Sequence, residues 1–251
     1  MRFSMCAIAV VILLGGCGPT EGDRKVLTEA YARYGVRDFA GTEDLAGKYI
    51  EKEPTAENVD EAFYLRGLAR YGRGDRVGAT ADLGKAIEHT KRADLKCKAY
   101  MTMGDIAFDQ YRWEDAVTDY QGAMGTGVKV EPRLEFRLGA ALQAVGQWEN
   151  ARQHFAAVGV GGGDAALAER ARERMEAKVF SLQFGAFKEG ARAGELLRQV
   201  KGAGIQASVG SELHEKQLVF VVRAGSYTTW RDAEAGRKRV AGKYPGAVVV
   251  P

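Results

Sequence analysis

Cysteine, histidine and proline are scarce in this chain of 251 residues, which contains 3, 3 and 5 of them. No two histidines have the spacing of a metal-binding pair, and too few cysteines are present for a disulfide-stapled scaffold. The sequence also lacks a glycine-rich phosphate loop and the elbow that carries a nucleophilic serine. We therefore predict neither enzymatic activity nor a cofactor.

A large excess of one charge is absent as well. Lys and Arg number 36 against 33 Asp and Glu, which gives a net charge of +3. Hydrophobic residues make up 46% and charged residues 27%, values typical of soluble globular proteins, and the length suits two domains better than one. From residue 180 onward, 11 basic side chains accompany 6 acidic ones, an excess too small to indicate nucleic-acid binding.

The first residues have the pattern of an export signal. Arg2 precedes an apolar run over residues 6–14, which is too short to span a bilayer, since a helix needs roughly 20 residues for that. Residues 14–17 read Leu-Gly-Gly-Cys and resemble the lipobox of bacterial lipoproteins. The resemblance implies that residues 1–16 are removed and that Cys17 becomes the lipidated first residue. An ordinary secretory signal that happens to contain a cysteine is the alternative.

A lipidated Cys17 implies attachment to a membrane, because several acyl chains anchor stably where one holds only marginally. The next residue is Gly18 rather than Asp, which favours the outer membrane of a diderm host, with the protein facing the periplasm. Residues 17–23 then serve as a linker. Cys6 leaves with the signal, so Cys97 is the remaining thiol, and its helical surroundings predict a packed side chain.

An internal repeat fills the middle of the chain. Three glycines, 37 and 35 residues apart, are each followed twelve residues later by alanine and four residues beyond that by a large apolar residue. The three sets are Gly67, Ala79 and Leu83; Gly104, Ala116 and Tyr120; and Gly139, Ala151 and Phe155. This pattern resembles the tetratricopeptide repeat (TPR), a helix–turn–helix unit of about 34 residues. We predict a helical TPR solenoid over residues 24–178, with a degenerate first repeat at 24–54 and a capping helix from residue 165.

Family members hold peptides or partner proteins on the surface of such a stack. The resemblance therefore implies an unidentified protein partner on the repeats, although a spacer between the membrane and the C-terminal domain is the alternative. Arg66 and Arg70 depart from the family pattern, because apolar or aromatic residues are usual at their positions.

Residues 179–251 change from helical to alternating periodicity. Strands are expected at 180–187, 205–209, 217–224 and 247–250, and helices at 191–200 and 230–240. The order βαββαβ is a split βαβ arrangement, like that of RNA-binding (RNP) domains, with both helices on one face of the sheet. The two halves match at a shift of 40 residues, as the following pairs show: Gly185 and Gly225, Phe187 and Tyr227, Ala193 and Ala233, Val200 and Val240.

This duplication, together with the segments at 182–187 and 221–227, closely resembles the SPOR (sporulation-related repeat) domain. The resemblance implies binding to peptidoglycan, specifically to glycan strands stripped of their stem peptides, and a role in cell-wall processing or cell division. The same βαββαβ order serves single-stranded RNA binding, but the open face has no aromatic pair and the chain is exported. Nucleic acid is therefore not expected as a partner.

Strand alternation predicts which side chains form the glycan site. With Leu182, Phe184 and Phe187 directed to the helices, the first strand presents other residues on the open face, and the third strand does the same with residues of its own. The expected glycan-binding residues are Ser181, Gln183, Gly185, Val219, Val221, Arg223 and Tyr227.

The polar members of this set suit a sugar polymer. Gln183 can donate and accept hydrogen bonds, and Arg223 offers five donors. Exposed residues of either type are also common on solvated sheets. Ala186 and Val221 stand where Ser or Thr and Arg are usual in the family, so two polar contacts are missing.

We therefore predict a non-catalytic envelope lipoprotein that docks on naked glycan and holds a partner on its repeats. Two alternatives remain at this point. The repeats do the essential work as an assembly scaffold with weak or lost glycan binding, or they bind and regulate a wall hydrolase.

Overall fold

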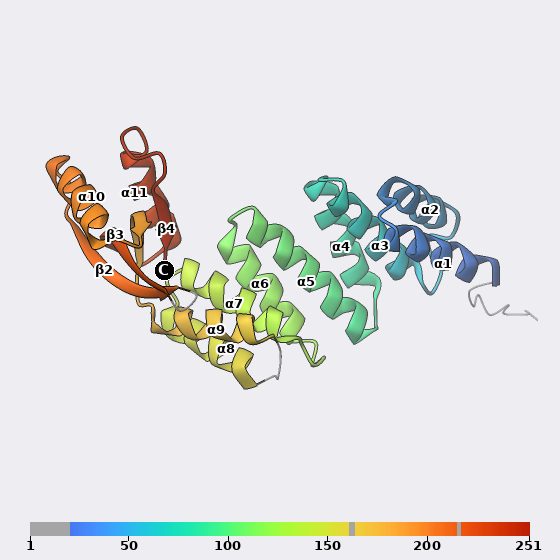
Figure 1. Cartoon of the computed structure of the whole chain (residues 1–251). Coiled ribbons are helices and arrows are strands. Elements are labelled where there is room, and N and C mark those ends of the chain that lie inside the picture. Colours follow the sequence, from blue (N-terminus) through green and yellow to red (C-terminus); the bar gives the residue numbers. More distant parts are fainter. Residues whose placement is uncertain (1–20, 161–163, 215–216) are drawn as a thin grey trace, which may run out of the picture. The chain divides into compact units, whose positions relative to one another are not determined.

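The computed structural model describes residues 21–160, 164–214 and 217–251 (Figure 1). It contains two compact units that meet in sequence between Leu95 and Lys96. The predicted signal at 1–16 and the predicted lipidation site Cys17 lie outside the described residues. No helix in the described ranges combines the length and the apolar character needed to cross a membrane.

The first unit consists of helix–turn–helix pairs. Its helices are α1 (Glu21–Gly35), α2 (Phe39–Lys52), α3 (Val59–Gly72) and α4 (Arg76–His89). Asp38 and Asp75 begin α2 and α4, and each side chain accepts a hydrogen bond of 2.9 Å from a backbone N–H three residues later. Leu27, Tyr49 and Leu65 are among the buried residues that join the first three helices.

Arg66 and Arg70, the two departures from the repeat pattern, share one buried carboxylate. Asp82 on α4 is 2% exposed, and it accepts hydrogen bonds from Arg66 Nη2 at 2.8 Å and from Arg70 Nη1 at 2.9 Å. The carboxylate of Glu43, on α2, lies 3.0 Å from Arg70 Nε. A buried carboxylate is costly unless it is paired and hydrogen-bonded, so an ionic network replaces the usual apolar contact here.

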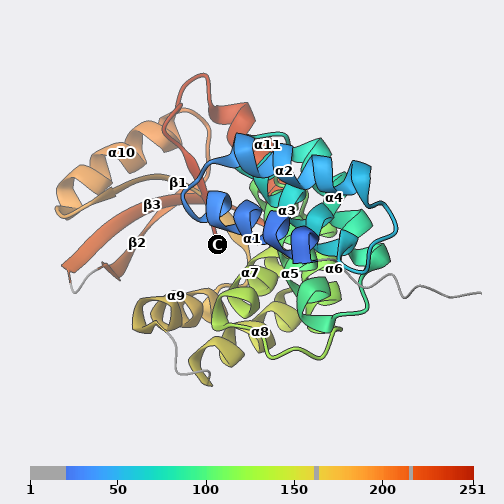
Figure 2. The same cartoon turned by 90° about the vertical axis from the view of Figure 1, so that its right-hand side faces the viewer.

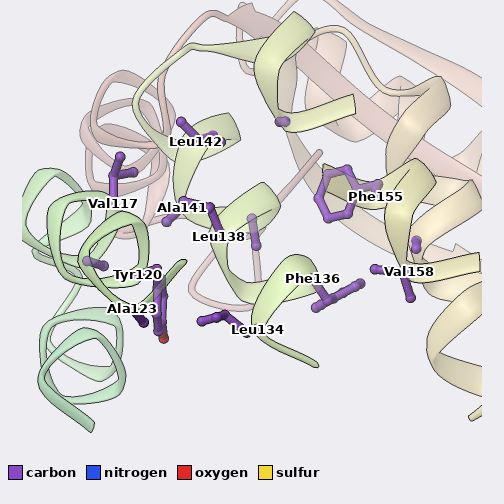
Figure 3. Packing of buried hydrophobic residues seen from close by; sticks show 14 of the residues in the cluster. Val117, Tyr120, Ala123, Leu134, Phe136, Leu138, Ala141, Leu142, Phe155 and Val158 are labelled. Atoms are coloured by element: carbon purple, nitrogen blue, oxygen red, sulfur yellow. The ribbon is translucent and has the colours of Figure 1, made fainter. Parts of the chain in front are cut away.

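The second unit continues the repeats. Its helices are α5 (Ala93–Asp109), which begins just before the boundary, then α6 (Trp113–Met124), α7 (Pro132–Ala144), α8 (Trp148–Val160) and α9 (Ala165–Glu176). Tyr120, Leu134, Leu138 and Phe155 lie in its buried core, which Figure 3 shows between α6, α7 and α8. Cys97 is 3% exposed, which confirms the packed thiol.

The glycines of the repeat pattern lie where helices touch. A Cβ added to Gly67 would come within 3.0 Å of Leu83, one added to Gly104 within 2.5 Å of Tyr120, and one added to Gly139 within 2.8 Å of Phe155. In each case the glycine and the large residue belong to the two helices of one repeat. The structure thus confirms the repeat spacing seen in the sequence, and it shows the cause: each glycine makes room for the large residue of the partner helix.

Helix α9 closes the repeat array. The side chain of Gln143, 1% exposed, donates to the backbone oxygen of Arg174 at 2.8 Å and accepts from the Arg174 guanidinium at 3.1 Å. The guanidinium of Arg170 lies 4.9 Å from the ring centre of Phe136. These contacts fix α9 as the final, capping helix that the sequence predicts.

The remaining residues form an antiparallel sheet with two helices, as predicted. The elements are β1 (Phe180–Phe187), α10 (Gly190–Gly202), β2 (Ala207–His214), β3 (Gln217–Tyr227), α11 (Trp230–Val240) and β4 (Val248–Val250), and the strand order is β2-β3-β1-β4. Both helices lie on one side of the sheet (Figures 1 and 2). β2 and β3 extend beyond the predicted ends and pair along a long hairpin.

The sheet domain contacts the repeats through their turns. The indole Nε1 of Trp148 donates to the backbone oxygen of Thr228 at 2.9 Å, and the Trp148 ring lies 5.0 Å from the ring of Phe180. Arg231, at the start of α11, lies 3.1 Å from a carboxylate oxygen of Glu114 on α6. The second unit therefore contains the repeats α5–α9 and the sheet together.

Candidate functional site

The register of β1 against β3 defines the two faces of the sheet. Leu182 pairs with Ala224, and the next pair is Gln183 with Arg223. Leu182 is 2% exposed on the face covered by the helices. Because side chains alternate along a strand, Gln183 and Arg223 lie on the opposite, open face. The prediction for these two residues is confirmed in position.

A polar cluster spans three neighbouring strands of this face. The guanidinium of Arg223 donates to Gln183 Oε1 from Nε at 3.2 Å and from Nη2 at 3.0 Å, and Nη2 also donates to Glu212 Oε2 at 3.0 Å. Glu212 comes from β2 and lies opposite Val219 on β3. We call Gln183, Arg223 and Glu212 the open-face cluster.

Glu212 was not predicted as a site residue. The sequence predicts a second strand that ends at residue 209, which leaves Glu212 outside it, whereas β2 continues to His214. Val209 and Leu213 are four residues apart and share one face of an extended strand, so Glu212 lies on the other face with Ser208, which pairs with Arg223.

The Glu212 carboxylate compensates the charge of Arg223. The Gln183 amide keeps its two N–H donors, because its oxygen is the atom that meets the guanidinium. Arg223 and Glu212 side chains are 29% and 44% exposed, so both reach solvent. The cluster has no net charge, and it can offer both hydrogen-bond donors and acceptors to a polar ligand.

Gly185 does not lie on the open face, and this prediction is wrong. The register shifts between Gln183 and Gly185, so two residues of β1 oppose Val222 alone. Such a bulge breaks the simple alternation of a strand. A Cβ added to Gly185 would lie 3.0 Å from Leu196 on α10 and 2.8 Å from the ring of Phe187. Gly185 thus makes room for the side chains of Phe187 and Leu196 on the helix-covered side of the sheet.

Tyr227 is also directed to the helices. A Cβ added to Gly236 on α11 would clash with the Tyr227 hydroxyl, and one added to Gly225 would clash with its ring. Gly225 has a φ of 80°, which glycine adopts readily. The pair Gly225 and Tyr227 repeats the packing of Gly185 and Phe187, so the shift of 40 residues is a structural duplication. The structure does not bring Tyr227 into the open-face cluster.

The remaining predicted residues surround the cluster. Ser181 pairs with Val250, Val219 with Glu212, and Val221 with Gly210 and Ala186. Val221 is 3% exposed, which makes it part of the floor, whereas Val248 beside Gln183 is 49% exposed. The open face therefore combines a polar centre with apolar side chains around it. Such a surface suits a ligand that has both polar groups and apolar ring faces.

Metal-binding side chains do not gather in the described residues. No cluster of three or more His, Cys, Asp or Glu side chains suited to a metal ion occurs in them. His89 stacks on the ring of Phe63, at 5.7 Å between centroids, and His154 Nδ1 lies 2.7 Å from Glu135 Oε2. Both histidines are thus used in helix packing within their own repeats.

Two protein families match parts of the chain. The SPOR domain family matches residues 176–251, and the outer membrane lipoprotein family YfiO matches residues 19–100. Both the SPOR domain and the repeats belong to classes of non-catalytic binding modules. A comparison with curated proteins gives no significant match.

Solved structures with similar folds are repeat proteins. A tetratricopeptide repeat protein from Parabacteroides merdae is 14% identical, with 73% of this chain and 66% of that chain covered and a TM-score of 0.53. PilF of Pseudomonas aeruginosa is 14% identical, with 90% and 93% covered and a TM-score of 0.51. At this identity the likeness concerns the fold. The chain therefore joins helical repeats of the TPR type to a C-terminal SPOR domain, a module of the peptidoglycan-binding class.

Proposed function

We propose that this protein is a non-catalytic envelope lipoprotein that binds glycan strands lacking stem peptides through the open face of its SPOR domain. The observation that carries the proposal is the open-face cluster, in which three strands bring Gln183, Arg223 and Glu212 into hydrogen-bonding contact on the face of the sheet that the helices leave open. Cys17 is proposed as the lipid anchor, and the match to an outer membrane lipoprotein family supports the envelope as its location.

The chemistry of a naked glycan strand fits this face. Its sugars present hydroxyl and acetamido groups, which pair with the amide of Gln183 and the guanidinium of Arg223. Their ring faces carry C–H groups, which suit exposed valines such as Val248. Ser181, Val219 and Val221 are proposed to complete the surface. Stem peptides hinder a strand from lying flat on a sheet, so their removal favours binding.

The repeats are proposed to hold a partner protein that acts in cell-wall processing or division. A chain attached to lipid at one end and to glycan at the other keeps such a partner close to the wall. The effective concentration of the partner at the wall rises, because glycan binding by a chain already held at the membrane resembles an intramolecular event.

Co-sedimentation of the mature chain with cell-wall sacculi tests the proposal. Binding is expected to rise after an amidase removes the stem peptides. Gln183→Ala is expected to weaken this binding about tenfold, because a hydrogen-bonding group facing a ligand contributes about 0.5–1.5 kcal/mol and also orients Arg223. Gln206→Ala is the matched control, since Gln206 is an exposed glutamine outside the strands. Equal binding of both variants and the wild type would contradict the proposal.

A scaffold or hydrolase regulator with weak glycan binding is the second candidate. It is favoured by Ala186 and Val221, which leave the face with fewer polar groups, and by Glu212, which occupies part of the Arg223 guanidinium. Photocrosslinking from the repeats in cells discriminates the two. Capture of a wall hydrolase, together with unchanged localisation of Gln183→Ala, supports this candidate.

A further inference from the structure

The turn between α5 and α6 holds an exposed tyrosine in a conformation that favours glycine. Tyr111 has a φ of 58°, whereas the corresponding turn positions of the neighbouring repeats are Gly74 at 86° and Gly146 at 84°. The residue is 61% exposed, so burial does not explain its presence. A strained position that keeps a large side chain points to a contact made by that side chain.

The Tyr111 ring forms an aromatic platform with the SPOR domain. It stacks on Trp230 of α11, with centroids 4.9 Å apart and planes at 5°. Trp113 meets Trp230 edge-on, with centroids 5.3 Å apart. Stacking covers one face of the Tyr111 ring, and its high exposure shows that the remaining surface is open to solvent. The platform exists because a repeat turn and the SPOR domain each supply a ring.

An open hollow of about 790 Å³ borders this platform, and we call it the junction site. Its volume lies within the roughly 300–1,000 Å³ that is usual for ligand pockets. Besides the two rings, Lys238, Pro245 and Val249 line it. The site therefore has an aromatic wall, an apolar floor and a cation.

Lys238 is the cation of this site that forms no salt bridge within the described part of the chain, although the carboxylate of Glu234, which also lines the hollow, interacts with it electrostatically. Arg237 also lines the hollow, but Glu234 pairs with its guanidinium at 2.6 Å through two hydrogen bonds. Lys238 is exposed and makes no salt bridge with another described residue. Glu234, Arg237 and Lys238 together carry one negative and two positive charges, so an anionic group in the hollow would meet a net positive charge.

A naked glycan strand supplies both chemistries. Pyranose rings lay their C–H groups on the negative face of an aromatic ring. An amidase that removes a stem peptide leaves one lactyl carboxylate on each muramic acid, so the naked strand is a polyanion. We propose that the junction site is a second contact for the same strand, with a sugar ring on Tyr111 and a lactyl carboxylate at Lys238. This inference rests on the glycan binding proposed above.

The test measures binding of the mature chain to soluble naked strands, before and after carbodiimide coupling converts the carboxylates to amides. Tyr111→Gly is expected to lower affinity about two- to tenfold, the contribution of one aromatic contact. Because glycine suits the left-handed turn, this variant keeps its backbone. Lys238→Ala is expected to lower affinity about two- to fivefold, as for an exposed ion pair, and to lose the sensitivity to amidation.

Arg239→Ala is the matched control, because Arg239 is an exposed cation on the same helix that does not line the hollow. It is expected to retain the sensitivity to amidation. The junction site is overturned if Lys238→Ala and Arg239→Ala bind alike and Tyr111→Gly binds as the wild type does. If Gln183→Ala still binds about tenfold more weakly in the same experiment, the open-face proposal stands. If the wild type does not bind naked strands, both proposals fail.

Discussion

Burial raises the pKa of Asp119, on α6, from its ordinary 3.8 to about 6, and the neighbouring carboxylate of Asp115 adds to the rise. An acid whose pKa is higher in the folded state than in the unfolded state destabilises the fold once it ionises. The stability of this unit is therefore expected to fall as the pH rises from about 4 to about 6.

Asp119→Asn removes this ionisation and is expected to stabilise the protein at pH 7 by about 1–2 kcal/mol, with little effect at pH 4. Denaturant unfolding at the two pH values measures the difference. Asp44→Asn is the control, since Asp44 lies in an exposed pair with Lys48, 2.8 Å apart, and exposed pairs contribute little. An equal gain at both pH values would show that the ionisation of Asp119 is not the cause.

Glycines allow the two helices of a repeat to pack closely. Replacing a glycine by alanine at a helix contact and at a helix position with open space around it distinguishes the effect of packing from that of helix propensity. Gly104→Ala places a Cβ 2.5 Å from the ring of Tyr120 and is expected to destabilise by about 1–3 kcal/mol, as overpacking does. Gly84→Ala in α4 meets nothing within 4 Å and is expected to stabilise by about 0.5–1 kcal/mol. Thermal unfolding of the two variants checks the opposite signs. Two shifts in the same direction would contradict the packing role of Gly104.

The repeats could be predicted from the sequence, because close contact between two helices requires a small residue on one and allows a large residue on the other. These residues recur at a regular spacing along the chain. Gly139 and Phe155 carry that signal in the sequence, and they touch in the structure. The ion network at Asp82 was not predictable, since Arg66 and Arg70 read only as departures until the partner helix is placed.

Predictions for the sheet failed where a local irregularity breaks the period of two. The positions of Gln183 and Arg223 follow from simple alternation and are confirmed. Gly185 follows a bulge, and one extra residue moves every later side chain to the other face. Glu212 depends on how far the β2–β3 hairpin extends, which is set by pairing rather than by the residues of one strand.

The contact between the SPOR domain and the repeats determines whether the second unit unfolds in a single cooperative transition. Trp148 supplies an indole donor to Thr228 and an aromatic contact to Phe180. Trp148→Ala removes both and is expected to weaken the contact by about 1–3 kcal/mol. Since Gln183 and Arg223 lie elsewhere, glycan binding by the open face is expected to persist.

Weakening this contact has a distinct signature. In the wild type, α9 and β1 are joined by the short segment 177–179, in which Lys178 and Val179 are exposed. Docking of the domain on the repeat turns is expected to restrain the backbone of this segment and so to slow its cleavage. Trp148→Ala is expected to speed proteolytic cleavage in this segment and to split calorimetric unfolding into separate transitions, because domains that no longer stabilise each other melt independently. Trp148→Phe keeps an aromatic ring but lacks the indole donor, so its rate of cleavage and its melting are expected to lie between those of the wild type and of Trp148→Ala. Identical proteolysis and melting of all three proteins would mean that the repeat turns do not hold the domain, and the aromatic platform at Tyr111 would then lack the rigid support that its proposed role requires.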